Sequence, residues 1–225
     1  MERRIGTYGE KSLHREVKWQ IEPTGAFHEA PVGKYIADIK DESGVTEIQT
    51  QSFNTLRGKL AALLPEHVVT VVYPLPREKY IEMLDAESGE ILRTRRSPKR
   101  GNFFHAFREL YRIKPLLTDA NLRLRLMLYD VTERRAIAKS RKGYRKIETN
   151  IREFCGELHI RSAGDYRKLV PDGLNEQFTS SDFAAAAGIS KRDSGVALNV
   201  LRRVGAVGLC GKSGRFNLYE LNNRL

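Results

Sequence analysis

The stretch from His67 to Pro74 (HVVTVVYP) constrains the fold of this chain more than any other segment. It is rich in valine and does not alternate between apolar and polar positions. Such a run is typical of a central strand that is buried on both faces. Before it, Ser52 is placed to cap a helix from Phe53 to Leu64, and Pro65 ends that helix. A helix leading into a doubly buried strand predicts an α/β protein.

The other patterns of residues 1–135 fit this class. Alternating runs on either side of Asp41–Gly44 predict a β-hairpin over 34–51, since this stretch has turn chemistry. The remaining expected elements are a helix over 10–21, a second hairpin from strands over 79–84 and 90–96, a helix over 103–117 and a strand over 122–131. Together they predict a mixed sheet flanked by helices.

The chain after residue 135 divides into two further parts. Residues 136–164 are predicted to be a basic, helical linker, with a helix over 147–158. In residues 165–225, Thr179 or Ser180 would cap a short helix and Ser190 a longer one that ends near Val204. A glycine-containing turn over 211–214 then joins two strands.

The charge of the chain suggests a polyanionic partner. The net charge is +11 and the isoelectric point is near 9.7, which favours nucleic acid. Residues 134–225 carry 18 Lys and Arg against 9 Asp and Glu, so most of the excess lies there. Simple solubility is the alternative explanation of this charge.

The two cysteines, Cys155 and Cys210, have no partner at metal-ligand spacing, so neither a disulfide framework nor a zinc site is expected. The N-terminal residues lack the apolar core of a signal peptide, and no apolar run is long enough to span a membrane. We therefore expect a cytoplasmic protein with no membrane partner.

The first hairpin carries the residues that most suggest chemistry. Asp38 lies on its first strand, and Glu47 and Gln49 lie on its second strand, on one face. The hairpin can therefore bring two carboxylates together with an amide beside them. Paired carboxylates suit a hard cation such as Mg²⁺ or Mn²⁺, which can activate water and stabilise a phosphoryl transition state.

Residues 1–135 resemble the PD-(D/E)XK nuclease superfamily, on the order of elements and on Asp38 and Glu47-Ile48-Gln49. The resemblance implies a restriction-endonuclease-like fold and metal-assisted hydrolysis of phosphodiester bonds. Asp38, Glu47 and the carbonyl of Ile48 would hold the divalent ion, and Gln49 would position water. Gln49 stands where the superfamily usually has lysine, and a neutral amide cannot lower the pKa of a nucleophile as an ammonium group can.

The superfamily often adds an acid from the first helix. Glu10 is the favoured candidate and a fourth catalytic residue, with Glu16 and Glu29 as alternatives. Among the histidines, His14 has the best chance of lying beside the site. Arg57 and Lys59, at the start of the next helix, could face either the strand or the solvent, and solvent is the favoured interpretation.

Residues 165–225 resemble winged-helix DNA-binding domains, on the motifs FTSSDFA, GISKRD, VLRRVG and GKSGR. The resemblance implies that the long helix enters the major groove and that the hairpin contacts phosphate or the minor groove. The implied DNA contacts are Lys191, Arg192, Ser194, Asn199 and Arg203 on the helix and Lys212 and Arg215 on the wing. Winged helices also serve as protein-docking modules.

A second candidate contact is the tract Arg93–Gly101 (RTRRSPKRG), in which Ser97-Pro98 breaks strand pairing. Its cations, Arg95, Arg96, Lys99 and Arg100 among them, suit phosphate groups. A solvated hairpin end is the alternative.

We therefore expect a Mg²⁺- or Mn²⁺-dependent deoxyribonuclease that binds double-stranded DNA. The alternatives are a nuclease-like DNA-binding regulator without activity and an interaction scaffold. The sequence leaves open whether two copies form a homodimer, as the cleavage of both strands of a duplex often requires.

Overall fold

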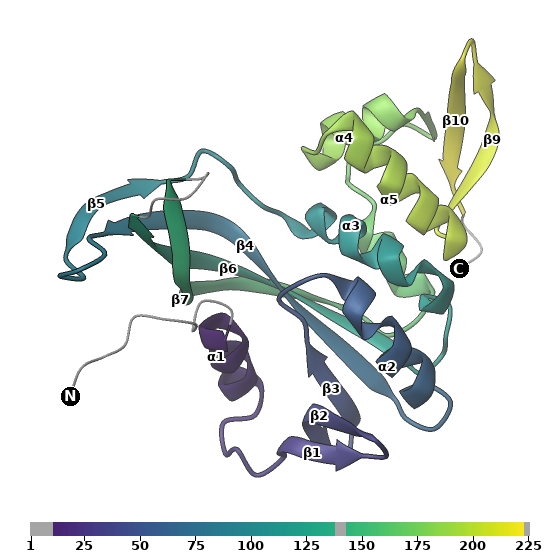
Figure 1. The fold of residues 1–225 in the computed structure, drawn as a ribbon. Helices are drawn as coiled ribbons and strands as arrows, with labels where there is room; N and C mark the ends of the chain where they lie inside the picture. The colour runs from purple at the N-terminus through teal and green to yellow at the C-terminus, as the bar shows by residue number, and fades with distance from the viewer. Residues whose placement is uncertain (1–10, 138–142, 223–225) are drawn as a thin grey trace.

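The computed structural model describes residues 11–137 and 143–222, and it shows an α/β protein with a large mixed sheet flanked by helices (Figure 1). Its helices are α1 (Lys11–Ile21), η1 (Phe53–Leu56), α2 (Arg57–Leu63), η2 (Phe103–Ala106), α3 (Phe107–Leu110), η3 (Tyr111–Leu116), η4 (Gly164–Leu169), α4 (Ser180–Ala187) and α5 (Lys191–Arg203), where η denotes a 3₁₀ helix. Its strands are β1 (His28–Val32), β2 (Tyr35–Asp41), β3 (Gly44–Ile48), β4 (Val69–Leu84), β5 (Ile91–Arg96), β6 (Leu122–Ile137), β7 (Tyr144–Ile160), β8 (Gln177–Phe178), β9 (Val207–Ser213) and β10 (Phe216–Leu221). No helix in these described ranges is long and apolar enough to cross a membrane.

The large sheet has seven strands in the order β1-β2-β3-β4-β6-β7, with β5 paired to β4. β3, β4 and β6 run parallel; α2 connects β3 to β4, and η2, α3 and η3 connect β5 to β6. The outer pairs are antiparallel. The predicted first hairpin and the buried strand that follows it are confirmed.

Helices cover the two faces of this sheet (Figure 1). α1 packs on one face through Val17, which joins a small core with Ile39 and Ile48. Ser12 and Glu16 tie α1 to β7 by hydrogen bonds to its backbone. α2 and α3 lie on the opposite face and bury leucine and phenylalanine side chains in the main core.

β4 is longer than the sequence predicted, because the strands expected over 67–74 and 79–84 are one strand. Pro74 and Pro76 lie inside it, and its register with β6 shifts between Pro76 and Lys79, where β4 accommodates one extra residue. A bulge of this kind bends a strand and tolerates proline. Beyond the shift, β4 pairs with β5, so β4 to β7 form an arm that extends past β3 (Figure 1).

The expected helical linker over 136–164 is wrong. β6 continues to Ile137, and β7 pairs with it antiparallel as part of the large sheet, so the expected helix over 147–158 is a strand and a boundary after residue 135 would cut β6. The helix expected over 103–117 is also corrected, since it consists of η2, α3 and η3 with a break in helical geometry at Ile113.

The last part of the chain, which we call the tail (residues 164–222), contains η4, α4, α5 and a three-stranded sheet in the order β8-β10-β9. Thr179 caps α4 in a capping box with Asp182, and Ser190 caps α5. α5 packs against α3, and buried side chains of both, such as Phe107 and Leu198, belong to one hydrophobic core. The tail is therefore docked on the large sheet through α3.

Candidate functional site

The hairpin of β2 and β3 places the two predicted carboxylates opposite each other. Ile39 pairs with Thr46, so one step further along Asp38 faces Glu47. The ladder ends at that step, because the Asp38 side chain takes the N–H of Ile48, which donates to Oδ2 at 2.7 Å. The hairpin opens at the point where the acids lie.

Asp38 is held as a carboxylate by donors around it. His14 of α1 places Nε2 at 3.1 Å from Oδ2. Burial acts to raise the pKa of Asp38, but the hydrogen bond and charge of His14, the N–H of Ile48 and the charge of Lys59 hold it below its ordinary value. The prediction that His14 neighbours the site is confirmed.

Glu47 is the most deeply buried acid of the site, with 5% of its side chain exposed. The ammonium group of Lys59 in α2 lies 2.5 Å from Oε1 and 2.6 Å from Oε2. Burial raises the pKa of Glu47 to about 7; Lys59 opposes this shift, and the negative charge of Asp38 adds to it. Glu47 is thus poised to gain or lose a proton near neutral pH.

Lys59 is the residue of the site for which the sequence favoured the wrong of two positions. We expected it to face solvent, but only 17% of its side chain is exposed, and it also donates to the carbonyl of Ile36. The available signal was its position one residue before the core residue Leu60, on the helix that leads away from the Glu47 strand. A cation therefore stands beside the acid pair, although the superfamily position holds Gln49.

Gln49 does not turn towards the acids. Its Nε2 donates to the carbonyl of Ser52 and to the hydroxyl of Thr55, and its Oε1 accepts the N–H of Gln51. The amide thus shapes the loop after β3, so the expected role of positioning water does not fit this arrangement.

A cavity of about 650 Å³ opens beside Glu47, and Asp38 is not among its lining residues. It is lined by residues of α1, by Glu47 and by the loop that follows β3, namely His14, Arg15, Lys18, Glu29, Glu47, Ile48, Gln49, Thr50, Gln51 and Leu56. We call it the acid-site cavity. Its volume is that of a small-ligand pocket.

The three candidates for a further acid fall in different places. Glu29 lines the acid-site cavity and pairs with Lys18. Glu16 accepts hydrogen bonds from Asn150 and from the backbone of Ile151, so it anchors α1 to β7 and does not join the acids. Glu10 lies outside the described residues.

The donors at the acid pair fit a hard divalent cation. Asp38, Glu47 and the Ile48 carbonyl offer oxygen ligands, and Oε1 of Glu47 is buried without a hydrogen-bond donor in good geometry. Lys59 already neutralises part of this charge.

A second group, Asp130, Glu153 and Cys155, has ligand atoms within 4.8 Å of one another. Arg77 binds both oxygens of Asp130, so this carboxylate belongs to a structural ion pair.

The tail residues expected to contact DNA separate into two sets. Ser194 is fully buried and donates to the carbonyl of Lys191, so its predicted contact with a base edge is wrong. Asn199 accepts a hydrogen bond from Lys114 of η3, which directs its side chain towards the docked face. Asn199 is nevertheless exposed, as are the other five residues, Lys191, Arg192, Arg203, Lys212 and Arg215.

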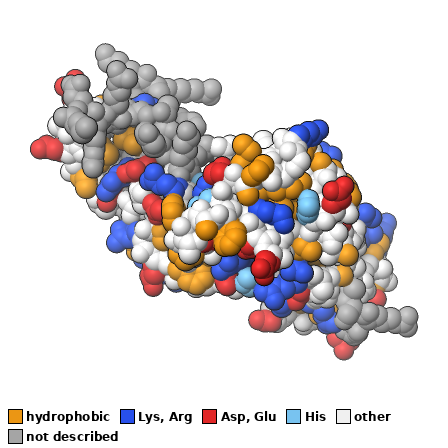
Figure 2. Space-filling view, turned by 90° about the horizontal axis from the view of Figure 1, so that it is seen from below, with side chains coloured by type: hydrophobic (Ala, Val, Ile, Leu, Met, Phe, Trp, Pro, Cys, Tyr) orange, Lys and Arg blue, Asp and Glu red, His pale blue; other side chains and the backbone are white. Residues whose placement is uncertain are grey.

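The Arg93–Gly101 tract likewise contains engaged and unengaged cations. Arg96 and Arg100 both pair with Glu78. Within the described ranges, the side chains of Arg95 and Lys99 have no acidic or hydrogen-bonding partner. On the face shown in Figure 2, basic, acidic and apolar side chains are mixed, so the positive charge is not gathered there.

The fold and site define a class of protein: a mixed α/β sheet with a carboxylate pair at the open end of a hairpin and a helical tail docked beside it. The chain belongs to the family of a domain of unknown function, DUF8091, whose model matches residues 11–161, from α1 to just past β7. An uncharacterized protein of Treponema pallidum (strain Nichols) is 34% identical over 222 residues, which cover 96% of this chain and 87% of that protein. No solved structure matches the chain.

Proposed function

We propose that this protein is a metal-dependent nuclease that hydrolyses phosphodiester bonds of DNA, with a restriction-endonuclease-like core and a winged-helix tail. The observation that carries the proposal is the pairing of Asp38 and Glu47 at the open end of the hairpin, with His14 and Lys59 beside them. The order α1, β2-β3 hairpin, α2 and β4 supports the likeness to the nuclease core.

Asp38, Glu47 and the Ile48 carbonyl would hold the Mg²⁺ or Mn²⁺ ion, which supplies Lewis-acid activation of water and of the phosphoryl group. His14 keeps Asp38 oriented through its hydrogen bond. Lys59 fixes Glu47 and places a positive charge at the site, where it can stabilise an anionic transition state. Gln49 keeps the following loop in shape.

The tail supports a nucleic-acid substrate. Two short helices, α4 and α5, precede the β9–β10 hairpin, and β8 completes the sheet, as in a winged helix. Lys191 and Arg192 stand exposed at the start of α5, and Lys212 and Arg215 are exposed on the hairpin. These cations would contact phosphates.

Cleavage assays on labelled DNA test the proposal. We expect cutting with Mg²⁺ or Mn²⁺ and none with EDTA, and we expect Asp38→Asn and Glu47→Gln each to abolish it. Glu66→Gln, which alters an exposed acid just past α2, is the matched control and should cut like the parent. Persistent cutting by both acid variants would contradict the proposed site.

A second candidate function is that of a DNA-binding regulator without nuclease activity. The hydrogen bonds of Gln49 to its own loop and the close ion pair of Lys59 with Glu47 favour it, because both occupy groups that a hydrolase would use. DNA binding without cutting under every divalent ion tried would support this alternative.

A further inference from the structure

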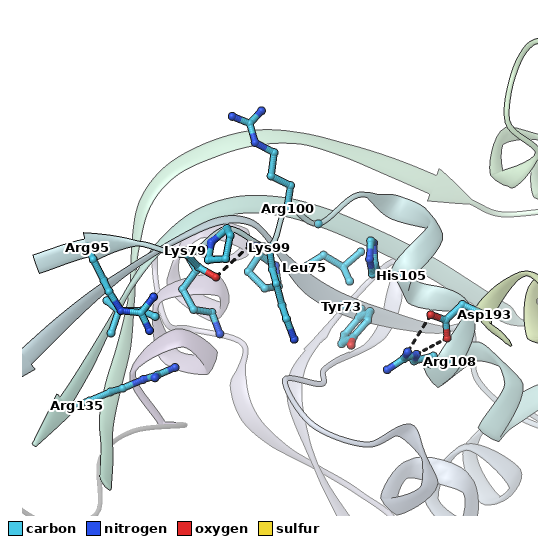
Figure 3. Close-up of a pocket in the computed structure, with 15 residues that line it drawn as sticks. Tyr73, Leu75, Lys79, Arg95, Lys99, Arg100, His105, Arg108, Arg135 and Asp193 are labelled. Carbon is cyan, nitrogen blue, oxygen red and sulfur yellow. Dashed lines mark hydrogen bonds and ion pairs between the residues drawn. The ribbon is translucent and has the colours of Figure 1, made fainter. Parts of the chain in front are cut away.

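A second cavity, of about 720 Å³, lies between the arm, the loop that follows β5 and the N-terminal end of α5 (Figure 3). Six cationic side chains and one acid line it: Lys79, Arg95, Lys99, Arg100, Arg108, Arg135 and Asp193. We call it the basic pocket. Such an excess of positive charge at a concave surface suits an anionic ligand.

Part of this charge is available to a ligand. Lys79 and Arg135 share the carboxylate of Glu133, and Arg108 forms two bonds with Asp193 at the far wall. Arg95 and Lys99 remain without a partner among the described residues. In Figure 3 these two side chains reach into the pocket, whereas Arg100 points outward.

The pocket also offers apolar and aromatic surface. Tyr73, Leu75 and Ile81 contribute from β4, and Pro98 contributes from the loop. Cations beside aromatic and apolar side chains are the combination that holds the backbone and bases of unpaired nucleic-acid strands.

The basic pocket and the acid-site cavity share no lining residue, but β4 links them. The N–H of Gln49, which lines the acid-site cavity, bonds to the carbonyl of Val72, and the next residue, Tyr73, lines the basic pocket. The ring of Tyr73 also packs on Phe53 of η1, 5.0 Å between ring centres. β4 thus connects the walls of the two cavities.

We propose that the basic pocket binds an unpaired DNA strand, with Arg95 and Lys99 as its principal phosphate contacts. The pocket has the size of a nucleotide-scale ligand site. A base-paired duplex presents its phosphates on a convex cylinder and does not enter such a space, whereas a frayed end or flap does. The inference rests on the proposed function only in taking DNA as the polymer.

Binding measured without cleavage tests this inference. Fluorescence anisotropy in EDTA would compare a labelled oligothymidylate strand with a blunt duplex. We expect the parent protein to bind the unpaired strand more tightly, and Arg95→Gln/Lys99→Gln to weaken that binding about tenfold. The slope of log affinity against log salt should fall by about 1.4, as for two lost phosphate contacts on a single strand.

The matched control is Arg161→Gln/Lys34→Gln, which removes one arginine and one lysine that are exposed and lie outside the pocket. It should bind the strand within about twofold of the parent, which is well under 1 kcal/mol. Equal losses in both double variants, or equal binding of strand and duplex by the parent, would overturn the inference.

The outcome is separable from that of the proposed function. Asp38→Asn should bind the strand like the parent even though it cuts nothing. If no substrate is cut by the parent but the Arg95/Lys99 variant still binds less tightly than its control, the nuclease proposal fails and the basic pocket remains a strand-binding site.

Discussion

At the scale of single residues, the ion pair between Lys59 and Glu47 dominates the candidate site. The pair is nearly buried, so water stabilises neither charge well. Each charged group is stabilised mainly by the opposite charge of its partner. The sequence located Asp38, Glu47 and His14, because hairpin alternation and helix position follow from local patterns. It could not locate Lys59, because the direction of a lysine on a short helix depends on how the whole helix packs.

Replacement of Lys59 should lower the stability of the fold by an amount that depends on pH. Lys59→Met leaves the Glu47 carboxylate buried without its partner, which should lower the free energy of unfolding by about 3 kcal/mol at pH 8. The loss should shrink at pH 5, because Glu47 then carries a proton. Chemical denaturation at both pH values measures this. Arg57→Met, at an exposed position of the same helix, is the control, and an equal loss at both pH values would contradict the expectation.

Glu47 should make stability fall as pH rises. Its pKa of about 7 lies above the unfolded value near 4.5, so the folded protein retains a proton that the unfolded chain releases. That contribution is complete below pH 4.5 and is lost as pH rises through 7, and it amounts to about 3 kcal/mol. The difference in unfolding free energy between the parent and Glu47→Gln, without divalent ions, should follow this curve; a difference independent of pH would refute it.

At the scale of elements, the structure differs from the sequence-based prediction in two strands: β4 is longer than predicted, and β7 was not predicted. The sequence predicted both β-hairpins, α2 and the buried part of β4, since these carry strong periodic or turn signals. It did not predict β7, whose residues Tyr144–Ile160 are mostly partly exposed and include many charged side chains. A strand of this composition gains its stability from pairing with β6, which no local pattern reveals.

The turn of the first hairpin should tolerate no side chain at Gly44. Its φ is +125°, and a Cβ there would lie 2.3 Å from the carbonyl oxygen of Val68. Gly44→Ala should therefore destabilise the fold by at least about 2 kcal/mol. Gly58→Ala is the opposite case, since Gly58 lies in α2 with nothing within 4 Å, and it should stabilise by about 0.5 kcal/mol. Thermal denaturation of the two variants measures both changes in stability, and changes of the same sign would contradict the expectation.

At the scale of the whole molecule, the tail and the large sheet share one core. Phe183 of α4 is fully buried and meets the rings of Phe104, Phe107 and Phe178, two of which belong to η2 and α3. The sequence predicted the helices and hairpin of the tail but treated it as a separate unit behind a linker. The contact surface between α3 and α5 arises from residues far apart in the sequence, so it could not be found from local patterns.

Unfolding should therefore be cooperative across the molecule. Phe183→Ala should cost about 3–5 kcal/mol and should shift a single calorimetric transition to lower temperature. Leu209→Ala, at an exposed apolar position of β9, serves as the control and should leave the transition nearly unchanged. Two resolved transitions in the parent, with only one sensitive to Phe183→Ala, would show that the tail folds independently.

The docking of the tail uses polar ties that recur along one side of η2, α3 and η3. Asn102 donates a hydrogen bond to the carbonyl of Ala187, Arg108 forms a salt bridge with Asp193, and Lys114 donates a hydrogen bond to Asn199. These three contacts hold α4 and α5 against the segment from Asn102 to η3. If the tail binds DNA, the protein sets the distance between the phosphates bound by the tail and the phosphate that is cleaved. The offset between the footprint and the cleavage position should then be the same on every substrate.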